Sequence, residues 1–271
     1  MKTLKNYTLI YDEDCPLCRS YTERFIAKKM LDESGRKPFS KISEKEKILI
    51  HPEVSRNKIA LINNRTGQVT YGLDSILKVL SPNYPMISRL VKLGWVKSVL
   101  LALYAFISYN RRIFMPVKTI DGKIQCSPTF NLKARLVLIF ISTTLSWLAL
   151  TLYSPLLDEF VAISSSGVEL LVAFGQLIFM SFFTLGYKKN RWLDYLGNLS
   201  VVSLIGSLAL IPIVLLDLFI EVDSLIALLW FNTCLTFMFL EHFRRIKILE
   251  LSKLLSVAWI GYRLIILIVL I

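Results

Sequence analysis

Charged residues are scarce in this sequence, and the scarcity is uneven. Asp, Glu, Lys and Arg make up 19% of the 271 residues, whereas soluble domains carry roughly 25%. Hydrophobic residues reach 54% and the mean hydropathy is +0.55. Most charges lie in residues 1–135, while residues 136–271 form long apolar runs separated by short charged loops. These features exclude an ordinary soluble chain and predict a polar N-terminal domain attached to a membrane body.

Cysteine is also scarce, and the four cysteines do not form an evident metal-ligand set. A structural zinc site needs about four ligands, and the N-terminal half offers the pair Cys15 and Cys18 with the scattered Cys126 and His51. We therefore expect no metal, with zinc as the weaker alternative. No signal peptide is visible, which indicates a cytosolic N-terminal domain, where thiols are kept reduced. A structural disulfide framework is not expected.

Five apolar segments in the second half are each close to the ~17–25 residues that a membrane-spanning helix needs. They cover approximately residues 136–156, 168–186, 196–220, 223–240 and 254–271. They predict an all-α transmembrane bundle of about five spans. Ser203, Gly206 and Ser207 are small residues that allow close helix packing, and Cys234 is expected to pack inside its span.

The loops around these segments alternate in charge. Basic residues precede the first segment and follow the second and fourth, and acidic residues follow the first and third. They are Lys133, Arg135, Asp158, Glu159, Lys188, Lys189, Arg191, Glu221, Asp223, Arg244, Arg245, Lys247 and Lys253. Basic loops mark the cytoplasmic side, so we expect an integral protein, of the bacterial inner membrane for example, with a cytosolic N-terminal domain and an outer C-terminus.

The net charge of +12 raises the question of a nucleic-acid partner. The basic residues cluster in short loops beside apolar runs, where they set membrane orientation more often than they bind phosphate backbones. We therefore expect membrane lipid as a partner and no nucleic acid.

The first 115 residues alternate between strand-like and helical patterns. Strands are expected at 7–12, 39–43, 57–64 and 68–72, the last two forming a hairpin, and helical segments from Cys15 to about Met30, at 44–50 and at 73–81, with a loop at 32–38. The order β-α-β-α-β-β-α predicts a thioredoxin-like α/β domain. The apolar run 98–109 is too short to cross ~30 Å of hydrocarbon. It predicts a core helix, or one in the membrane interface beside Arg111 and Arg112.

Cys15 and Cys18 follow a strand and a turn and begin a helix. A cysteine at a helix start lies among unpaired backbone N–H groups at the positive end of the helix dipole, which favours its thiolate. Cys18 lies three residues further along the same face, so the two sulfurs can form a disulfide. We predict that Cys15 is the exposed nucleophile and Cys18 the more buried, resolving cysteine. Two inert packing cysteines are the alternative.

The neighbours of the pair have mixed effects. Pro16 at an early helical position leaves no hydrogen bond unmade and fixes the turn. Arg19 favours a thiolate, whereas Asp12, Glu13 and Asp14 oppose it.

The segment "YDEDCPLC", followed by a helix, resembles the DCC family of thiol-disulfide oxidoreductases, a thioredoxin-like group named for its D-x-x-C-x-x-C motif. The motif is here Asp12, Cys15 and Cys18. "VTYGLDSILKVL" is similar to the family's glycine-led helix, and "LYAFISYNRRIF" to its closing Tyr-x-x-Ile-x-x-Asn-Arg segment. The resemblance covers about residues 7–115. It implies thiol-disulfide exchange in which a redox-active disulfide is used and no other cofactor is required.

Several residues outside the motif are further candidates. Cys126, in the linker, is either a third exchanging thiol, a palmitoylation site or a cysteine without a special role. Ionisable residues near spans are functional candidates by default, and they are Glu169, Asp217, Glu241, His242 and Arg263. Arg263 lies well inside the last apolar segment, so we expect it to pair with a carboxylate of another helix or to face a head-group pocket.

The sequence thus predicts a thioredoxin-like DCC-type domain at 1–115, a linker at 116–135 and a transmembrane helical region at 136–271. The expected function is that of a membrane-tethered thiol-disulfide oxidoreductase acting on the cytosolic face, with protein or small-molecule thiols as partners. The alternative is a membrane transport or lipid-handling protein whose N-terminal domain is a sensor or binding module. A bundle of this size favours the alternative, because one helix would suffice as an anchor.

Overall fold

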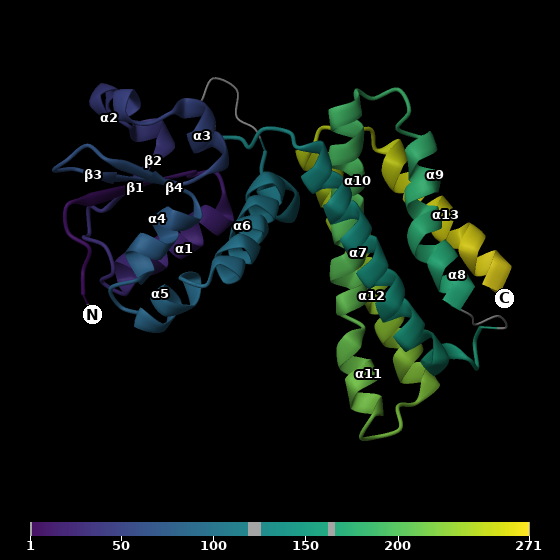
Figure 1. Cartoon of the computed structure of the whole chain (residues 1–271). Coiled ribbons are helices and arrows are strands. Elements are labelled where there is room, and N and C mark those ends of the chain that lie inside the picture. Colours follow the sequence, from purple (N-terminus) through teal and green to yellow (C-terminus); the bar gives the residue numbers. More distant parts are fainter. Residues whose placement is uncertain (1, 119–125, 162–165, 271) are drawn as a thin grey trace. The chain divides into compact units, whose positions relative to one another are not determined.

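The chain divides into two units, residues 1–131 and 132–271, shown in Figure 1. The computed structural model describes residues 2–118, 126–161 and 166–270. The first unit contains a β-sheet with helices, and the second is helical.

A four-stranded mixed sheet lies at the centre of the first unit, in the order β2-β1-β3-β4. The strands are β1 (Tyr7–Tyr11), β2 (Arg36–Pro38), β3 (Ala60–Asn63) and β4 (Val69–Tyr71). β1 pairs with β2 in parallel and with β3 in antiparallel orientation, and β3 and β4 form the expected hairpin. Successive side chains of a strand point to opposite faces. Accordingly Leu9 and Leu61 belong to one apolar cluster, and Ile10 and Ile62 to another.

The described residues of this unit also form helices α1 (Pro16–Ala27), α2 (Glu44–Leu49), α3 (Pro52–Asn57), α4 (Leu73–Leu80), α5 (Pro85–Val91) and α6 (Gly94–Phe114). Two local predictions are wrong. β2 lies in the segment predicted as a loop, and the strand predicted at 39–43 is a 3₁₀ turn, Phe39–Lys41. A three-residue strand carries no alternation signal of its own, and β2 exists because Arg36 to Pro38 pair with β1. The helix α3 was also not expected.

The C-terminal half of α6 packs on the first unit, as expected of a core helix. The Ile59 N–H donates to the Tyr104 hydroxyl at 3.1 Å, and the Ser108 hydroxyl donates to the Asn57 carbonyl. The N-terminal half exposes apolar side chains such as Trp95 and Leu103. A bend of 100° separates α5 from α6, and the pair together is long and apolar enough for one broken span.

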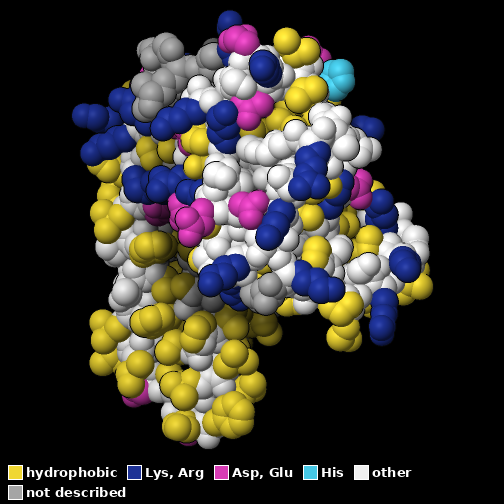
Figure 2. Space-filling model, turned by 90° about the vertical axis from the view of Figure 1, so that its left-hand side faces the viewer, with side chains coloured by type: hydrophobic (Ala, Val, Ile, Leu, Met, Phe, Trp, Pro, Cys, Tyr) yellow, Lys and Arg dark blue, Asp and Glu magenta, His cyan; other side chains and the backbone are white. Residues whose placement is uncertain are grey.

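The second unit is a bundle of helices (Figure 1). They are α7 (Leu132–Tyr153), α8 (Ser166–Leu170), α9 (Gln176–Phe182), α10 (Lys189–Leu208), α11 (Ile211–Asp217), α12 (Ser224–Ile248) and α13 (Leu254–Leu270), with a 3₁₀ turn at Ser154–Leu157 and a π-helical turn at Leu171–Gly175 between α8 and α9. Exposed large apolar side chains occur along all the longer helices. In Figure 2 they cover much of the lower part of the molecule.

The expectation of five spans is wrong by the lengths of the described helices. Three segments are long and apolar enough to cross a membrane, Leu132–Leu157, Lys189–Asp217 and Ser224–Ile248, and the bent pair α5 and α6 would make a fourth. Gly167–Phe182 and Leu254–Ile268 are shorter apolar helices. The apolar segment 168–186 is longer than the helix that it forms, because its last apolar residues follow the end of α9. Three to four such helices indicate a membrane protein.

Small and charged residues organise the second unit. A Cβ atom at Gly206 of α10 would lie 2.2 Å from Met238 Cγ of α12, so the glycine permits the close packing expected there. At the end where α10 begins, Arg135 pairs with Asp194 at 2.9 Å and Arg191 donates to the Glu250 carbonyl at 2.8 Å. The basic loops predicted to be cytosolic thus gather at one end of this unit (Figure 1).

Candidate functional site

A tight turn after β1 places the first cysteine. The Cys15 N–H donates to the Asp12 carbonyl at 3.3 Å, and the Asp14 N–H donates to the Asp12 carboxylate at 3.1 Å. Cys15 is the N-cap residue of α1, with extended backbone angles (φ −90°, ψ 110°), and Pro16 occupies the first helical position as expected. Cys15 therefore lies at the positive end of the helix, where a negative sulfur is favoured.

The two thiols influence each other directly. Hydrogen bonding from the Cys18 thiol, followed by hydrogen bonding from the Cys18 N–H, lowers the pKa of Cys15 to about 6 against the opposing effect of burial. The same thiol–thiol hydrogen bond raises the pKa of Cys18, and burial raises it further. The charge of the pair is thus concentrated on Cys15 at neutral pH, and its role as the nucleophile stays a prediction.

The predicted difference in exposure is wrong. Cys15 is 1% exposed and Cys18 is 8% exposed. The N-cap position leaves backbone N–H groups free but does not expose the side chain, because surrounding residues cover the Cys15 sulfur although Pro16 beside it is exposed. A reagent can reach Cys15 only if this cover moves.

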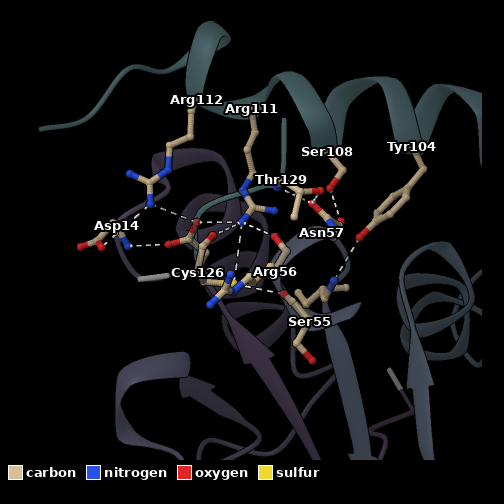
Figure 3. Close-up of polar contacts among 12 residues, drawn as sticks. Asp14, Ser55, Arg56, Asn57, Tyr104, Ser108, Arg111, Arg112, Cys126 and Thr129 are labelled. Atoms are coloured by element: carbon tan, nitrogen blue, oxygen red, sulfur yellow. Dashed lines mark hydrogen bonds and ion pairs between the residues drawn. The ribbon is translucent and has the colours of Figure 1, made fainter. Parts of the chain in front are cut away.

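A buried arginine, Arg111 near the end of α6, supplies the positive charge at this site (Figure 3). Its Nη2 atom lies 3.0 Å from Asp12 Oδ2 and also donates to the Arg56 carbonyl at 3.0 Å and to the Cys126 carbonyl. Arg112 lies 3.5 Å from the same Asp12 carboxylate oxygen. The positive charge of Arg111 is a further cause of the lowered pKa of Cys15.

The supporting residues predicted from sequence are placed differently. Asp12 is buried, and burial raises its pKa although Arg111 and Arg112 act in the opposite direction. Arg19 is exposed on α1, and it is not among the main causes of the Cys15 shift. Arg111 is a cation that does lower this pKa, and the predicted role of Arg19 stays a prediction. Arg111 lies in the segment "LYAFISYNRRIF" that resembles the DCC family, so the sequence points to this residue. The sequence does not show that Arg111 contacts Asp12.

Cys126 belongs to the same site. Its thiol lies 3.1 Å from the Ser55 carbonyl, and burial raises its pKa to about 11. Residues beyond it hold the chain on the unit, since the Thr129 N–H donates to the Asn57 side chain at 2.9 Å. A buried, protonated thiol is a poor nucleophile, so these features oppose palmitoylation or ready exchange at Cys126.

A cavity of about 220 Å³ adjoins the pair. Cys18 lines it, together with Cys126 and Arg111, and Cys15 does not. Most of the remaining wall is apolar or aromatic: Ile10, Tyr11, Leu17, Tyr21, Phe39, Ile59, Ile76, Tyr104 and Ile107. An apolar cavity of roughly 150 Å³ binds benzene, so this one has room for a ring-sized molecule.

The described residues contain no cluster of three or more His, Cys, Asp or Glu side chains suited to a metal ion. The four cysteines are free thiols, and each is buried.

The chain matches no protein family model, no curated protein and no solved structure at a significant level. What the structure establishes is a small mixed sheet with helices, two neighbouring cysteines at a helix start, and a long helical part with three to four apolar helices.

Proposed function

We propose that this protein is a membrane-tethered thiol-disulfide oxidoreductase of DCC type, acting through Cys15 and Cys18 on the cytosolic face. The observation that carries the proposal is the placement of Cys15 as the N-cap residue of α1 with Cys18 three residues later, which agrees with a pKa of Cys15 lowered to about 6. Such a thiol is largely ionised at neutral pH, and the thiolate is the species that attacks disulfides.

The surrounding fold supports the same proposal. The sheet order β2-β1-β3-β4, with the pair directly after β1, agrees with the layout of a thioredoxin-like layer. Asp12 and Arg111, from the two segments that resemble the DCC family, form a buried ion pair beside the cysteines. The basic end of the second unit supports a cytosolic position for the N-terminal domain.

The proposed exchange has two steps. The Cys15 thiolate attacks one sulfur of a substrate disulfide, forms a mixed disulfide and releases a substrate thiolate, which takes the Cys18 proton. The Cys18 thiolate then attacks the Cys15 sulfur, forms the Cys15–Cys18 disulfide and releases the second substrate sulfur as a thiolate, which takes a proton from water. The substrate gains the two electrons that the pair loses, and a dithiol reductant reverses the reaction.

Trapping of mixed disulfides tests this proposal, with variants of the full-length protein in detergent micelles that each have one cysteine replaced by serine. Cys18→Ser should accumulate mixed disulfides with partner thiols, because nothing resolves them. Cys15→Ser should trap almost none, and Cys234→Ser is the matched control that should behave as the unmodified protein. Equal trapping by Cys15→Ser and Cys18→Ser, or trapping by neither, would contradict the assigned roles.

The cavity supports a second candidate, a binding module attached to a transport or lipid-handling bundle. Its lining is mostly apolar, and both cysteines beside it are covered. In that case a Cys15→Ser, Cys18→Ser double variant would retain function in cells, whereas the oxidoreductase would lose it.

A further inference from the structure

A cluster of polar side chains inside the second unit is independent of the thiol pair. Five helices contribute to a cavity of about 20 Å³. Its polar lining consists of Ser146 of α7, Gln176 of α9, Ser203 and Ser207 of α10, Cys234 of α12 and Arg263 of α13. These are residues from the apolar half of the chain, where polar groups are rare and expensive to bury.

Arg263 has an amide, and no carboxylate, as its partner in this cluster. One of its Nη atoms donates to Gln176 Oε1 at 2.7 Å, and its guanidinium lies 5.1 Å from the ring centre of Trp259. Among the residues that the structure describes, no carboxylate oxygen lies within ion-pair distance of Arg263. The expected carboxylate partner is thus wrong. The amide and the ring reduce the free-energy cost of burying the cation but do not neutralise it.

Two buried N–H donors remain without an acceptor among the described residues. They are Arg263 Nε and Gln176 Nε2, both inaccessible to solvent. Gln176 is only 1% exposed, and both residues line the cavity. An unsatisfied buried donor costs about 1–3 kcal/mol, and the common remedy is an ordered acceptor such as water or an ion.

We propose that this cavity binds a monatomic anion of the size of chloride. A cavity needs roughly 10–15 Å³ of space open to a water-sized sphere in order to hold one water molecule. This cavity has about 20 Å³ of such space, so it holds a single water-sized particle and excludes oxyanions. Water would satisfy the two donors but would leave the charge of Arg263 uncompensated. A halide satisfies the donors and neutralises the charge, and the hydroxyls of Ser203 and Ser207 are further potential donors.

Thermal unfolding of the full-length protein in detergent micelles tests the anion site. Sodium chloride should raise Tm by at least about 2 °C relative to sodium gluconate at equal ionic strength, in a saturable manner. Gln176→Leu should raise the half-saturating chloride concentration about tenfold, and Arg263→Gln should abolish the difference between the salts. Arg244→Gln is the control, because Arg244 is exposed and pairs with Glu241 away from the cavity.

An increase of Tm by chloride that persists in Arg263→Gln would overturn the proposal. Equal Tm values of the unmodified protein in both salts would also overturn it, and this is the result expected if water fills the cavity. Should Arg263→Gln not fold, chloride NMR of the unmodified protein decides. The site predicts a chloride line broadened beyond that of empty micelles and narrowed again by competing bromide, and no excess broadening would refute it.

Discussion

Arg111 Nη2 lies 3.0 Å from Asp12 Oδ2, although 99 residues separate the two in the chain. Both side chains are almost fully buried, at 6% and 3% exposure. The contact joins the end of α6 to the turn that places Cys15. The position of this turn therefore depends on Arg111.

Replacing Arg111 should therefore affect both stability and the thiol. Arg111→Gln leaves the Asp12 carboxylate buried with a weaker partner, and breaking a buried pair costs about 3–5 kcal/mol. Loss of the positive charge should raise the pKa of Cys15, which the pH dependence of iodoacetamide alkylation measures. Arg19→Gln is the matched control and should leave that pH dependence unchanged. A larger effect from Arg19→Gln would restore the role predicted from sequence.

Alkylation of Cys15 should increase with pH through a midpoint of about 6 and then level off. Stability should follow from the same shift. The folded pKa lies below the ordinary value of 9.0, so the contribution of Cys15 is present above pH 9 and is lost as pH falls through 6. Cys18 has the opposite shift, so its contribution is lost above pH 9. Urea unfolding of Cys15→Ser should show no rise in stability between pH 6 and 9.

The length of an isolated N-terminal domain should decide whether it folds. A chain truncated after Asn131 keeps Arg111 and the Thr129–Asn57 hydrogen bond. A chain truncated after Tyr109 loses both and leaves Asp12 without its buried partner. We expect thermal unfolding to be cooperative for the longer chain and lost or at much lower temperature for the shorter one. Equal Tm values for the two chains would show that the domain folds without the last turn of α6 and the contacts of Arg111.

The charges at the ends of the helical unit predict its orientation. A reporter inserted in the basic loop Lys188–Arg191 should be cytosolic, and one inserted in the acidic loop Glu221–Asp223 should lie on the outer side. The long apolar segment Lys189–Asp217 separates these two loops and is long enough to cross a membrane. An external reporter in the loop would instead indicate that α8 and α9 form a re-entrant segment.

Gly206→Ala should destabilise the helical unit. The new Cβ would lie 2.2 Å from Met238 Cγ, and overpacking of this kind typically costs about 1–3 kcal/mol. Gly261→Ala is the matched control in α13, because a Cβ there meets nothing within 4 Å. The second variant should be neutral or slightly stabilising, since alanine favours a helix by about 1 kcal/mol over glycine. Combining Gly206→Ala with Met238→Ala should recover part of the loss, as measured by Tm in micelles.

Local sequence determined the elements whose signals lie within a few residues of one another. Tyr7–Tyr11, the β3–β4 hairpin, α1 and α4 follow from apolar periodicity and turn chemistry, and each is present. The lowered pKa of Cys15 also follows from local geometry, because the N-cap position and a thiol three residues later are adjacent in sequence. The capping box of Ser43 and Glu46 at the start of α2 is equally local.

Only the tertiary structure decided the features that depend on distant partners. β2 exists through its pairing with β1, and no alternation in three residues reveals it. The Arg111–Asp12 pair and the amide partner of Arg263 join segments up to 99 residues apart. The number of long spans could not be predicted from the sequence either. An apolar segment includes residues that lie beyond the end of a helix as well as residues within it, so its length overestimates the helix. Helix ends and long-range contacts are set by packing, which no short window of sequence contains.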